Sequence, residues 1–353
     1  MIISDQPHRP LRPKKMRQRI WRERMVRISL AALGAVAMAL ALASPAHAQS
    51  CANRGTLDAR YCDADNDLLA DTPSDKAQQK NPDTLVFSYT PVEDPAVYEN
   101  VFSDFLAHLS KVTGKRIRWF SAESYAAQIE AMRSGRLHIA GVASGPTPFA
   151  VNLAGFVPIV AMERHDGGVG YTLQLIVPKD SPIKSIADLK GKRVAHVAPS
   201  SNSGDTAPRV LFKDKGVEPG KDYEVLYSGK HDNSIMGVVN KDYDAAPVAS
   251  SVVDRMRARG MFKPDDLRIV YESAPFPRTA FGISHDLAPE LQDKIRQAFM
   301  TFDFKNSKLA KEFKDEKGFK ALSYKADWAD IRTIQRDTGI VYTQDGLSKL
   351  KPD

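Results

Sequence analysis

Short apolar runs alternate with amphipathic segments along most of the chain after residue 83. Where apolar residues recur at helical spacing, we predict helices over Val97–Thr113, ended by Gly114, and over Ser124–Ser134, ended by Gly135. The apolar runs predict strands over Thr84–Tyr89, Arg116–Phe120, Leu137–Val142, Leu173–Val177, Arg193–Val197, Tyr223–Tyr227, Tyr243–Pro247 and Leu267–Tyr271. This alternation favours an α/β architecture with mainly parallel sheets covered by helices on both faces.

Two stretches rich in proline and polar residues divide the pattern, at Val177–Lys192 and at Ser273–Phe281. We interpret them as crossings between two lobes: residues 83–176 and 277–353 form lobe 1, and residues 177–276 form lobe 2. The last helices, near Pro289–Phe304 and Ala326–Thr338, are expected to pack on lobe 1. Two lobes joined by two crossings enclose a cleft, and α/β proteins bind small ligands at the carboxyl ends of their strands.

The N-terminal segment has the features of a secretory signal peptide. Residues 9–27 contain nine Lys or Arg, an Ala-rich apolar stretch follows, and Ala46-His47-Ala48 supplies small residues two apart. We therefore predict a signal peptide over residues 1–48, cut after Ala48; an uncleaved anchor is the alternative. The formal net charge of +7 comes from this segment, because the rest of the chain has acidic and basic side chains in equal numbers. The charge therefore gives no support for nucleic-acid binding.

Both cysteines, Cys51 and Cys62, lie just after the predicted cleavage site. We expect them to form a disulfide, because in an oxidising compartment this is the simplest fate of two nearby cysteines and no further Cys or His lies close enough to complete a zinc site. The adjacent stretch Asp63–Asp71 has alternating carboxylates but lacks the Gly and the final Glu of a calcium loop, so we expect a solvated acidic arm; a calcium site is the alternative. Residues 49–82 as a whole are predicted to form an N-terminal extension outside the core.

Candidate chemistry is sparse, since the chain has no nucleophile elbow, no dinucleotide or phosphate loop and no zinc-protease motif. The stretch HVAPSSNSGDTAP, residues 196–208, joins an apolar run to a helical segment through three serines and an asparagine. It fits either a capped surface loop or an anion site at a helix N-terminus. His231 starts another such segment and could donate to a ligand oxygen, carry charge beside an anion, or only cap its helix. Tyr125 and Tyr171 fit either the core or a cleft.

Three segments in succession carry a resemblance to a known family: ESYAAQIEAMRSGRLHIA, GVGYTLQLIVPKDSPIKSIADLKGKRVAHVAPSSNSG and SGKHDNSIMGVVNKDYDAA. They resemble the phosphonate and phosphite periplasmic binding proteins, the solute-binding subunits of ATP-driven importers. The resemblance covers roughly residues 84–345 and implies the two-lobed type II periplasmic-binding-protein fold. It also implies a periplasmic, non-enzymatic monomer without a cofactor that binds a small oxyanion and delivers it to an ABC permease. A sensor that presents an organic anion to a signalling partner is the alternative.

The resemblance assigns individual residues. The family's Ser-Thr-Ser triplet, which binds phosphonate oxygens, falls on Ser201, Asn202 and Ser203. The histidine that completes the oxyanion cage falls on His231, and the tyrosines of the other lobe fall on Tyr125 and Tyr171. Hydroxyls and helix N–H groups suit a tetrahedral anion, because several donors must be directed at its oxygens.

Three positions bear on the ligand. Members that bind aminoethylphosphonate hold its ammonium with two carboxylates, which fall here on Ser251 and Thr279, with Arg278 adjacent. A buried ammonium without a carboxylate is costly, so unless Asp232 or another acid substitutes we expect phosphite, phosphate or a small non-amino phosphonate. Asn202 in place of Thr keeps a donor but changes its reach.

Overall fold

A six-stranded sheet forms the centre of lobe 1 in the computed structural model, which describes residues 51 and 53–349 of the chain. In spatial order the strands are β13 (Glu316–Ala321), β4 (Phe156–Arg164), β12 (Ala280–Ser284), β3 (Ile139–Val142), β1 (Thr84–Tyr89) and β2 (Arg116–Trp119). Strand β1 pairs in parallel with β2 and β3, whereas β12 and β13 pair antiparallel to their neighbours.

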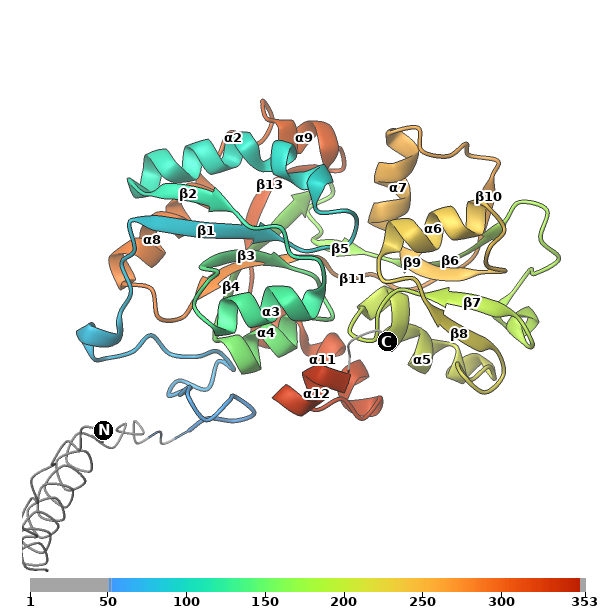
Figure 1. Cartoon of the computed structure of the whole chain (residues 1–353), viewed down its shortest axis with the longest axis horizontal. Coiled ribbons are helices and arrows are strands. Elements are labelled where there is room, and N and C mark those ends of the chain that lie inside the picture. The colour runs from blue at the N-terminus through green and yellow to red at the C-terminus, as the bar shows by residue number, and fades with distance from the viewer. Residues whose placement is uncertain (1–50, 52, 350–353) are drawn as a thin grey trace, which may run out of the picture. The chain divides into compact units, whose positions relative to one another are not determined.

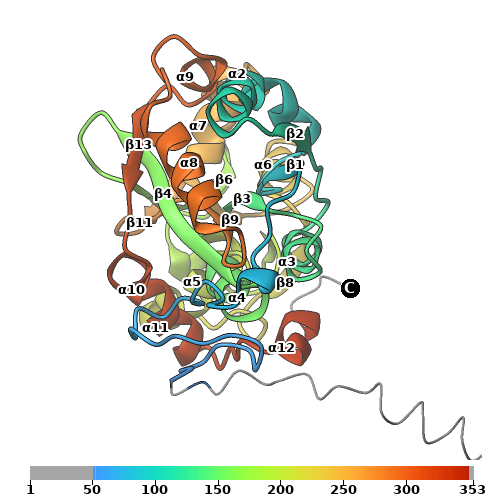
Figure 2. The ribbon, with the colours of Figure 1, turned by 90° about the vertical axis from the view of Figure 1, so that its left-hand side faces the viewer.

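Helices cover both faces of this sheet (Figure 1). On one face α2 (Ala96–Thr113) packs against α8 (Pro289–Met300) and α9 (Lys308–Glu312), and Figure 2 shows α8 beside β4 and β13. On the other face lie α3 (Tyr125–Arg133) and α4 (Thr147–Ala154). The predicted ends of α2 and α3 are confirmed: Gly114 and Gly135 adopt φ values of +71° and +73°, a conformation that glycine adopts without strain.

Lobe 2 is built on smaller sheets. In the three-stranded sheet, β6 (Leu173–Pro178) lies between β10 (Leu267–Glu272) and β9 (Ala246–Ala249), and both pairings are antiparallel. A parallel pair, β7 (Arg193–His196) and β8 (Glu224–Tyr227), lies beside β9. The helical elements are η2 (Ile186–Leu189), the π-helical turn η3 (Asn202–Thr206), α5 (Ala207–Leu211), η4 (Lys213–Lys215), α6 (His231–Val239) and α7 (Ser250–Ala258). The expectation of mainly parallel sheets was therefore wrong, because most strand pairs described here are antiparallel.

Two short strands, β5 (Gly170–Tyr171) and β11 (Phe276–Pro277), pair antiparallel where the chain passes between the lobes. Residues 173–178 form the central strand of the lobe 2 sheet, so in this structure the chain enters lobe 2 at about residue 171. The proline-containing stretch after Val177 is a turn within lobe 2.

The C-terminal elements α10 (Tyr324–Asp327), α11 (Ala329–Asp337) and α12 (Gln344–Lys349) lie below the sheets in Figure 1. Helix α11 contacts α5 and η3 of lobe 2 as well as the loop after β3 of lobe 1. Its Gln335 donates from Nε2 to the Gly145 carbonyl at 2.7 Å, and Trp328 donates from Nε1 to the Ser144 carbonyl at 3.0 Å. These two hydrogen bonds fix the loop after β3 to the C-terminal region.

The N-terminal arm, residues 53–82 with the short helix η1 (Lys76–Gln78), runs along lobe 1. The structure joins Cys51 to Cys62 in a disulfide. The arm is less solvated than we expected, because Leu57, Tyr61 and Asp63 are buried. The Tyr61 hydroxyl donates to the Leu153 carbonyl at 3.2 Å, which ties the arm to the end of α4.

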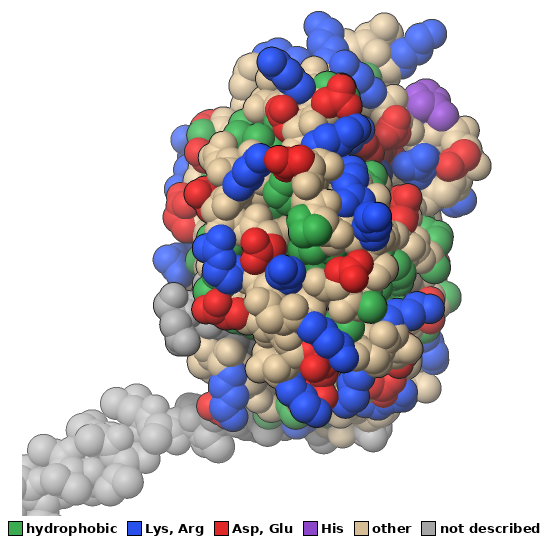
Figure 3. All heavy atoms as spheres, turned by 90° about the vertical axis from the view of Figure 1, so that its right-hand side faces the viewer, with side chains coloured by type: hydrophobic (Ala, Val, Ile, Leu, Met, Phe, Trp, Pro, Cys, Tyr) green, Lys and Arg blue, Asp and Glu red, His purple; other side chains and the backbone are tan. Residues whose placement is uncertain are grey.

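The predicted signal peptide lies outside the described residues. Within residues 51–349 as described, no helix has the length and apolar character needed to cross a membrane. On the lobe 2 end of the molecule, Lys and Arg are interspersed with Asp and Glu (Figure 3).

Candidate functional site

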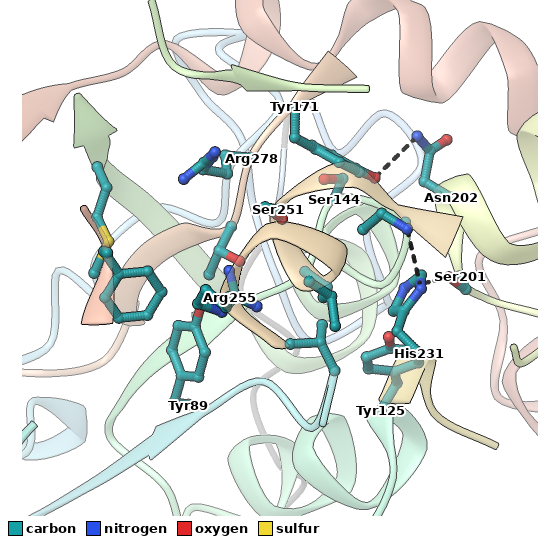
Figure 4. Close-up of a pocket in the computed structure, with 18 of the residues that line it drawn as sticks. Tyr89, Tyr125, Ser144, Tyr171, Ser201, Asn202, His231, Ser251, Arg255 and Arg278 are labelled. Carbon is teal, nitrogen blue, oxygen red and sulfur yellow. Dashed lines mark hydrogen bonds between the residues drawn. The ribbon is translucent and has the colours of Figure 1, made fainter. Parts of the chain in front are cut away.

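A buried cavity lies between the lobes, at the carboxyl ends of strands from both sheets (Figure 4). Lobe 1 contributes residues that follow β1 and β3, and lobe 2 contributes residues that follow β7, β8 and β9. The cavity has a volume of about 40 Å³. One water needs roughly 10–15 Å³ on this measure, so a ligand would take the place of about three waters.

Ser201 and Asn202 form one end of the cavity, where the loop after β7 enters η3. Ser201 caps this helix, since its Oγ accepts a hydrogen bond from the Gly204 N–H at 3.2 Å. The first N–H groups of a helix have no intrahelical acceptor, and with the helix dipole they favour an anion. Asn202 donates from Nδ2 to the Tyr171 hydroxyl at 3.3 Å, which connects lobe 2 to the first crossing.

His231, the first residue of α6, lines the same end of the cavity. Its Nδ1 accepts a hydrogen bond from the Ala249 N–H at 3.2 Å, so the proton of the neutral ring resides on Nε2. Nε2 lies 3.4 Å from Ser201 Oγ, within reach of a ligand oxygen beside that hydroxyl. Burial lowers the pKa of His231 to about 3, so of the roles we considered the site favours a neutral donor over a charged ring.

Two tyrosines complete this end of the cavity. Tyr125, the first residue of α3, comes from lobe 1, and Tyr171 comes from β5. Burial, together with the neighbouring Tyr171, raises the pKa of Tyr125, so its phenol stays protonated and can donate to an anion.

Five of the six predicted ligand-binding residues therefore meet in one cavity, and Ser203 is the exception. Ser203 is buried next to Ser201 and Asn202, but it does not line the cavity. Its Oγ has no hydrogen-bond partner in the described structure.

Among the residues that line the cavity, the sequence did not point to Tyr89, Ser144, Gly145 or Arg255. Tyr89 ends β1, and Ser144 and Gly145 follow β3, so the position of polar or small residues at the ends of parallel strands could have revealed them. Arg255 lies in the middle of the amphipathic helix α7, where nothing local distinguishes it from a surface arginine.

Arg255 forms a buried ion pair across the lobes. Its Nη2 donates to Glu93 Oε1 at 2.9 Å, and Arg259 also bonds to Glu93. Although burial acts to lower it, Tyr98 and Glu93 hold the pKa of Arg255 above its ordinary value. Because Glu93 follows β1 of lobe 1 and both arginines belong to lobe 2, the pair stabilises the closed arrangement.

No Asp or Glu lines the cavity among the described residues. Ser251 and Thr279, on which the resemblance places the two carboxylates expected for an ammonium ligand, both line the cavity. The possible substitute, Asp232, lies outside the lining and accepts a hydrogen bond from the Asp94 N–H at 3.0 Å. The cavity thus offers hydroxyls, an imidazole N–H and guanidinium groups, a set of donors suited to an anion.

Two lobes joined by paired crossings, with a donor-lined cavity between them, define a solute-binding protein of the type II periplasmic fold. Solved structures share this fold. A binding protein component of an ABC phosphonate transporter from Pseudomonas aeruginosa superposes with a TM-score of 0.66 at 23% identity, over 76% of this chain and 93% of that one. PhnD1 from Prochlorococcus marinus in complex with methylphosphonate gives 0.66 at 19% identity, over 73% and 99%.

Residues 87–328 match the family described as "ABC transporter, phosphonate, periplasmic substrate-binding protein", and the chain belongs to this family. The Phosphate-import protein PhnD of Mycolicibacterium smegmatis is 28% identical over 243 residues, which cover 65% of this chain and 75% of the relative. As a member of this family, the protein is a periplasmic substrate-binding component of an ABC transporter and not an enzyme.

Proposed function

We propose that this protein captures a phosphorus oxyanion in the periplasm by lobe closure and delivers it, as a monomer, to an ABC permease. The ligand is phosphite, phosphate or a small phosphonate without an amino group. The observation that carries this proposal is the meeting of Tyr125, Tyr171, Ser201, Asn202 and His231 around a cavity that no carboxylate of the described residues lines.

The donor set supports an oxyanion. Ser201 Oγ and His231 Nε2 lie 3.4 Å apart, so a single anionic oxygen can accept from both. The Tyr125 phenol faces them from lobe 1, and hydrogen bonds from several neutral donors to a charged acceptor are stronger than those between neutral groups. An ammonium group would meet Arg255 and Arg278 in place of a carboxylate, which disfavours aminoethylphosphonate. The names of the relatives, a phosphate importer and a methylphosphonate complex, agree with such ligands.

Isothermal titration of the purified protein tests the proposal. Phosphite, phosphate, methylphosphonate and 2-aminoethylphosphonate are titrated separately, and one of the first three should bind at least tenfold tighter than the amino compound. Ser201→Ala and His231→Ala should each weaken that binding by roughly tenfold or more, because each removes a hydrogen bond to a charged group. Exclusive binding of 2-aminoethylphosphonate, or unchanged affinity in both variants, would refute the proposal.

A further inference from the structure

Two arginines lie at the end of the cavity opposite Ser201, Asn202 and His231. In Figure 4, Arg255 and Arg278 lie on one side with Tyr89, whereas Ser201, Asn202 and His231 lie on the other. Arg255 comes from α7, and Arg278 directly follows β11. Their side chains are only 8% and 11% exposed, so the charges are largely removed from water.

The two guanidinium groups differ in how fully the protein satisfies them. Arg255 uses Nε and Nη2 on Glu93 and also bonds to the Tyr98 hydroxyl. Arg278 bonds through Nη1 to Glu316, but its buried Nε–H has no acceptor in the described part of the chain. A buried donor without an acceptor is costly, so Arg278 retains capacity for a ligand acceptor.

No carboxylate lines this cavity beside Arg278, whereas a second pocket that Arg278 also lines is surrounded by Asp254, Glu312, Asp315 and Glu316. Burial, followed by the like charge of Arg255, lowers the pKa of Arg278 to about 10. The lining of the cavity also includes the apolar side chains of Met162, Phe281 and Phe313. A low-dielectric wall strengthens any hydrogen bond that a ligand anion makes with the guanidinium group.

We propose that the ligand is a phosphonate whose carbon substituent carries a second anionic group, a carboxylate in the simplest case, which Arg278 binds at the end of the cavity opposite Ser201. This inference rests on the proposed function and narrows its substrate class. A planar guanidinium group matches a carboxylate geometrically and binds it through charge-assisted hydrogen bonds. Methylphosphonate or phosphite would leave the Arg278 Nε–H without a protein or ligand acceptor.

Titration of the purified protein with a matched ligand series tests the inference. Phosphonoacetate and methylphosphonate differ by one carboxylate, and 2-aminoethylphosphonate replaces this anion with a cation. We expect phosphonoacetate to bind at least tenfold tighter than methylphosphonate, with the amino compound weakest. Equal or tighter binding of methylphosphonate would overturn the inference while leaving the proposed function intact. If no phosphorus compound binds, the proposed function itself fails.

Substitution of Arg278 assigns the effect to its side chain. Arg278→Met should reduce the affinity for phosphonoacetate at least tenfold more than that for methylphosphonate, whereas Ser201→Ala should weaken both ligands by similar factors. Because Arg278→Met leaves Glu316 as a buried charge, the double variant Arg278→Met with Glu316→Gln provides the same comparison with a neutral pair. If the ratio of the two affinities is unchanged in both the single and the double variant, Arg278 does not bind the second group.

Discussion

Replacing Gly145 with alanine is expected to weaken ligand binding by obstructing lobe closure. Gly145 follows β3 of lobe 1, and its backbone lies against the loop that enters η3 in lobe 2. A Cβ atom at this position would lie 2.1 Å from the Ser200 carbonyl oxygen and 2.7 Å from the Asn202 backbone nitrogen. Since nonbonded heavy atoms pack at about 3.5–4.0 Å, the two backbones must separate by more than about 1 Å.

The magnitude follows from where this conflict lies. Overpacking costs about 1–3 kcal/mol, and here the cost falls on the closed state, because the clashing atoms belong to different lobes. The apparent affinity falls with the population of the binding-competent state. A cost of 1–3 kcal/mol therefore corresponds to a loss of affinity of about 5- to 150-fold.

Titration and thermal unfolding together separate this effect from general destabilisation. Gly145→Ala is titrated with phosphite, phosphate and methylphosphonate, and its thermal midpoint is measured without ligand. Gly318→Ala in β13 is the matched control, because a Cβ atom there meets nothing within 4 Å. Wild-type affinity in Gly145→Ala would refute the reasoning, as would a large loss of unliganded stability, which would place the clash within one lobe.

Three further predictions concern stability. Between pH 3 and about 6.5, His231 binds a proton in the unfolded state but not in the folded state. The free energy of unfolding should therefore fall as the pH drops through this window, by up to about 1.4 kcal/mol per pH unit. Denaturant titrations at several pH values should show a smaller slope for His231→Asn. Glu93→Gln removes the buried charged partner of Arg255 and should lower the free energy of chemical unfolding by about 3 kcal/mol. Asp345→Asn, which breaks an exposed ion pair, should lower it by less than about 0.5 kcal/mol. Equal losses in the two variants would contradict the stabilising role of the Glu93–Arg255 pair. Cys62→Ser should lower stability by about 2–3 kcal/mol without altering methylphosphonate affinity, and an unchanged thermal midpoint would show that the disulfide contributes nothing.

Local signals predicted the elements of lobe 1 that they control. Gly114 ends α2 and Ser124 caps α3, and both effects act within a few residues of the helix end. The strands β4 and β13 were missed for a physical reason. β4 is almost wholly buried and follows α4 after a single glycine, so its apolar run has no alternation. β13 has the polar sequence EKGFKA, and it is a strand because it pairs with the free edge of β4.

The donors of the cavity could be predicted from the sequence, but its charges could not. Ser201 and His231 follow strand-like runs, which places them at the carboxyl edge of lobe 2. The Arg255–Glu93 pair joins residues 162 positions apart, and its meaning depends on how two lobes close. The pattern of α7 gives no sign of it, because an amphipathic helix has charged residues on its solvent face in any case.

Ligand binding and closure are one equilibrium in this site, because His231 takes part in both. Its backbone N–H donates to the Val92 carbonyl of lobe 1 at 3.0 Å, while its ring bonds to Ala249 of lobe 2 and presents Nε2 beside Ser201. A ligand shifts a conformational equilibrium only by its differential affinity for the two states. An anion that contacts only Ser201 and Asn202 would bind the open and closed states nearly equally and leave the lobes open. One that also accepts from Tyr125 of lobe 1 gains affinity only on closure, so the contact with Tyr125 makes the closed complex depend on the ligand.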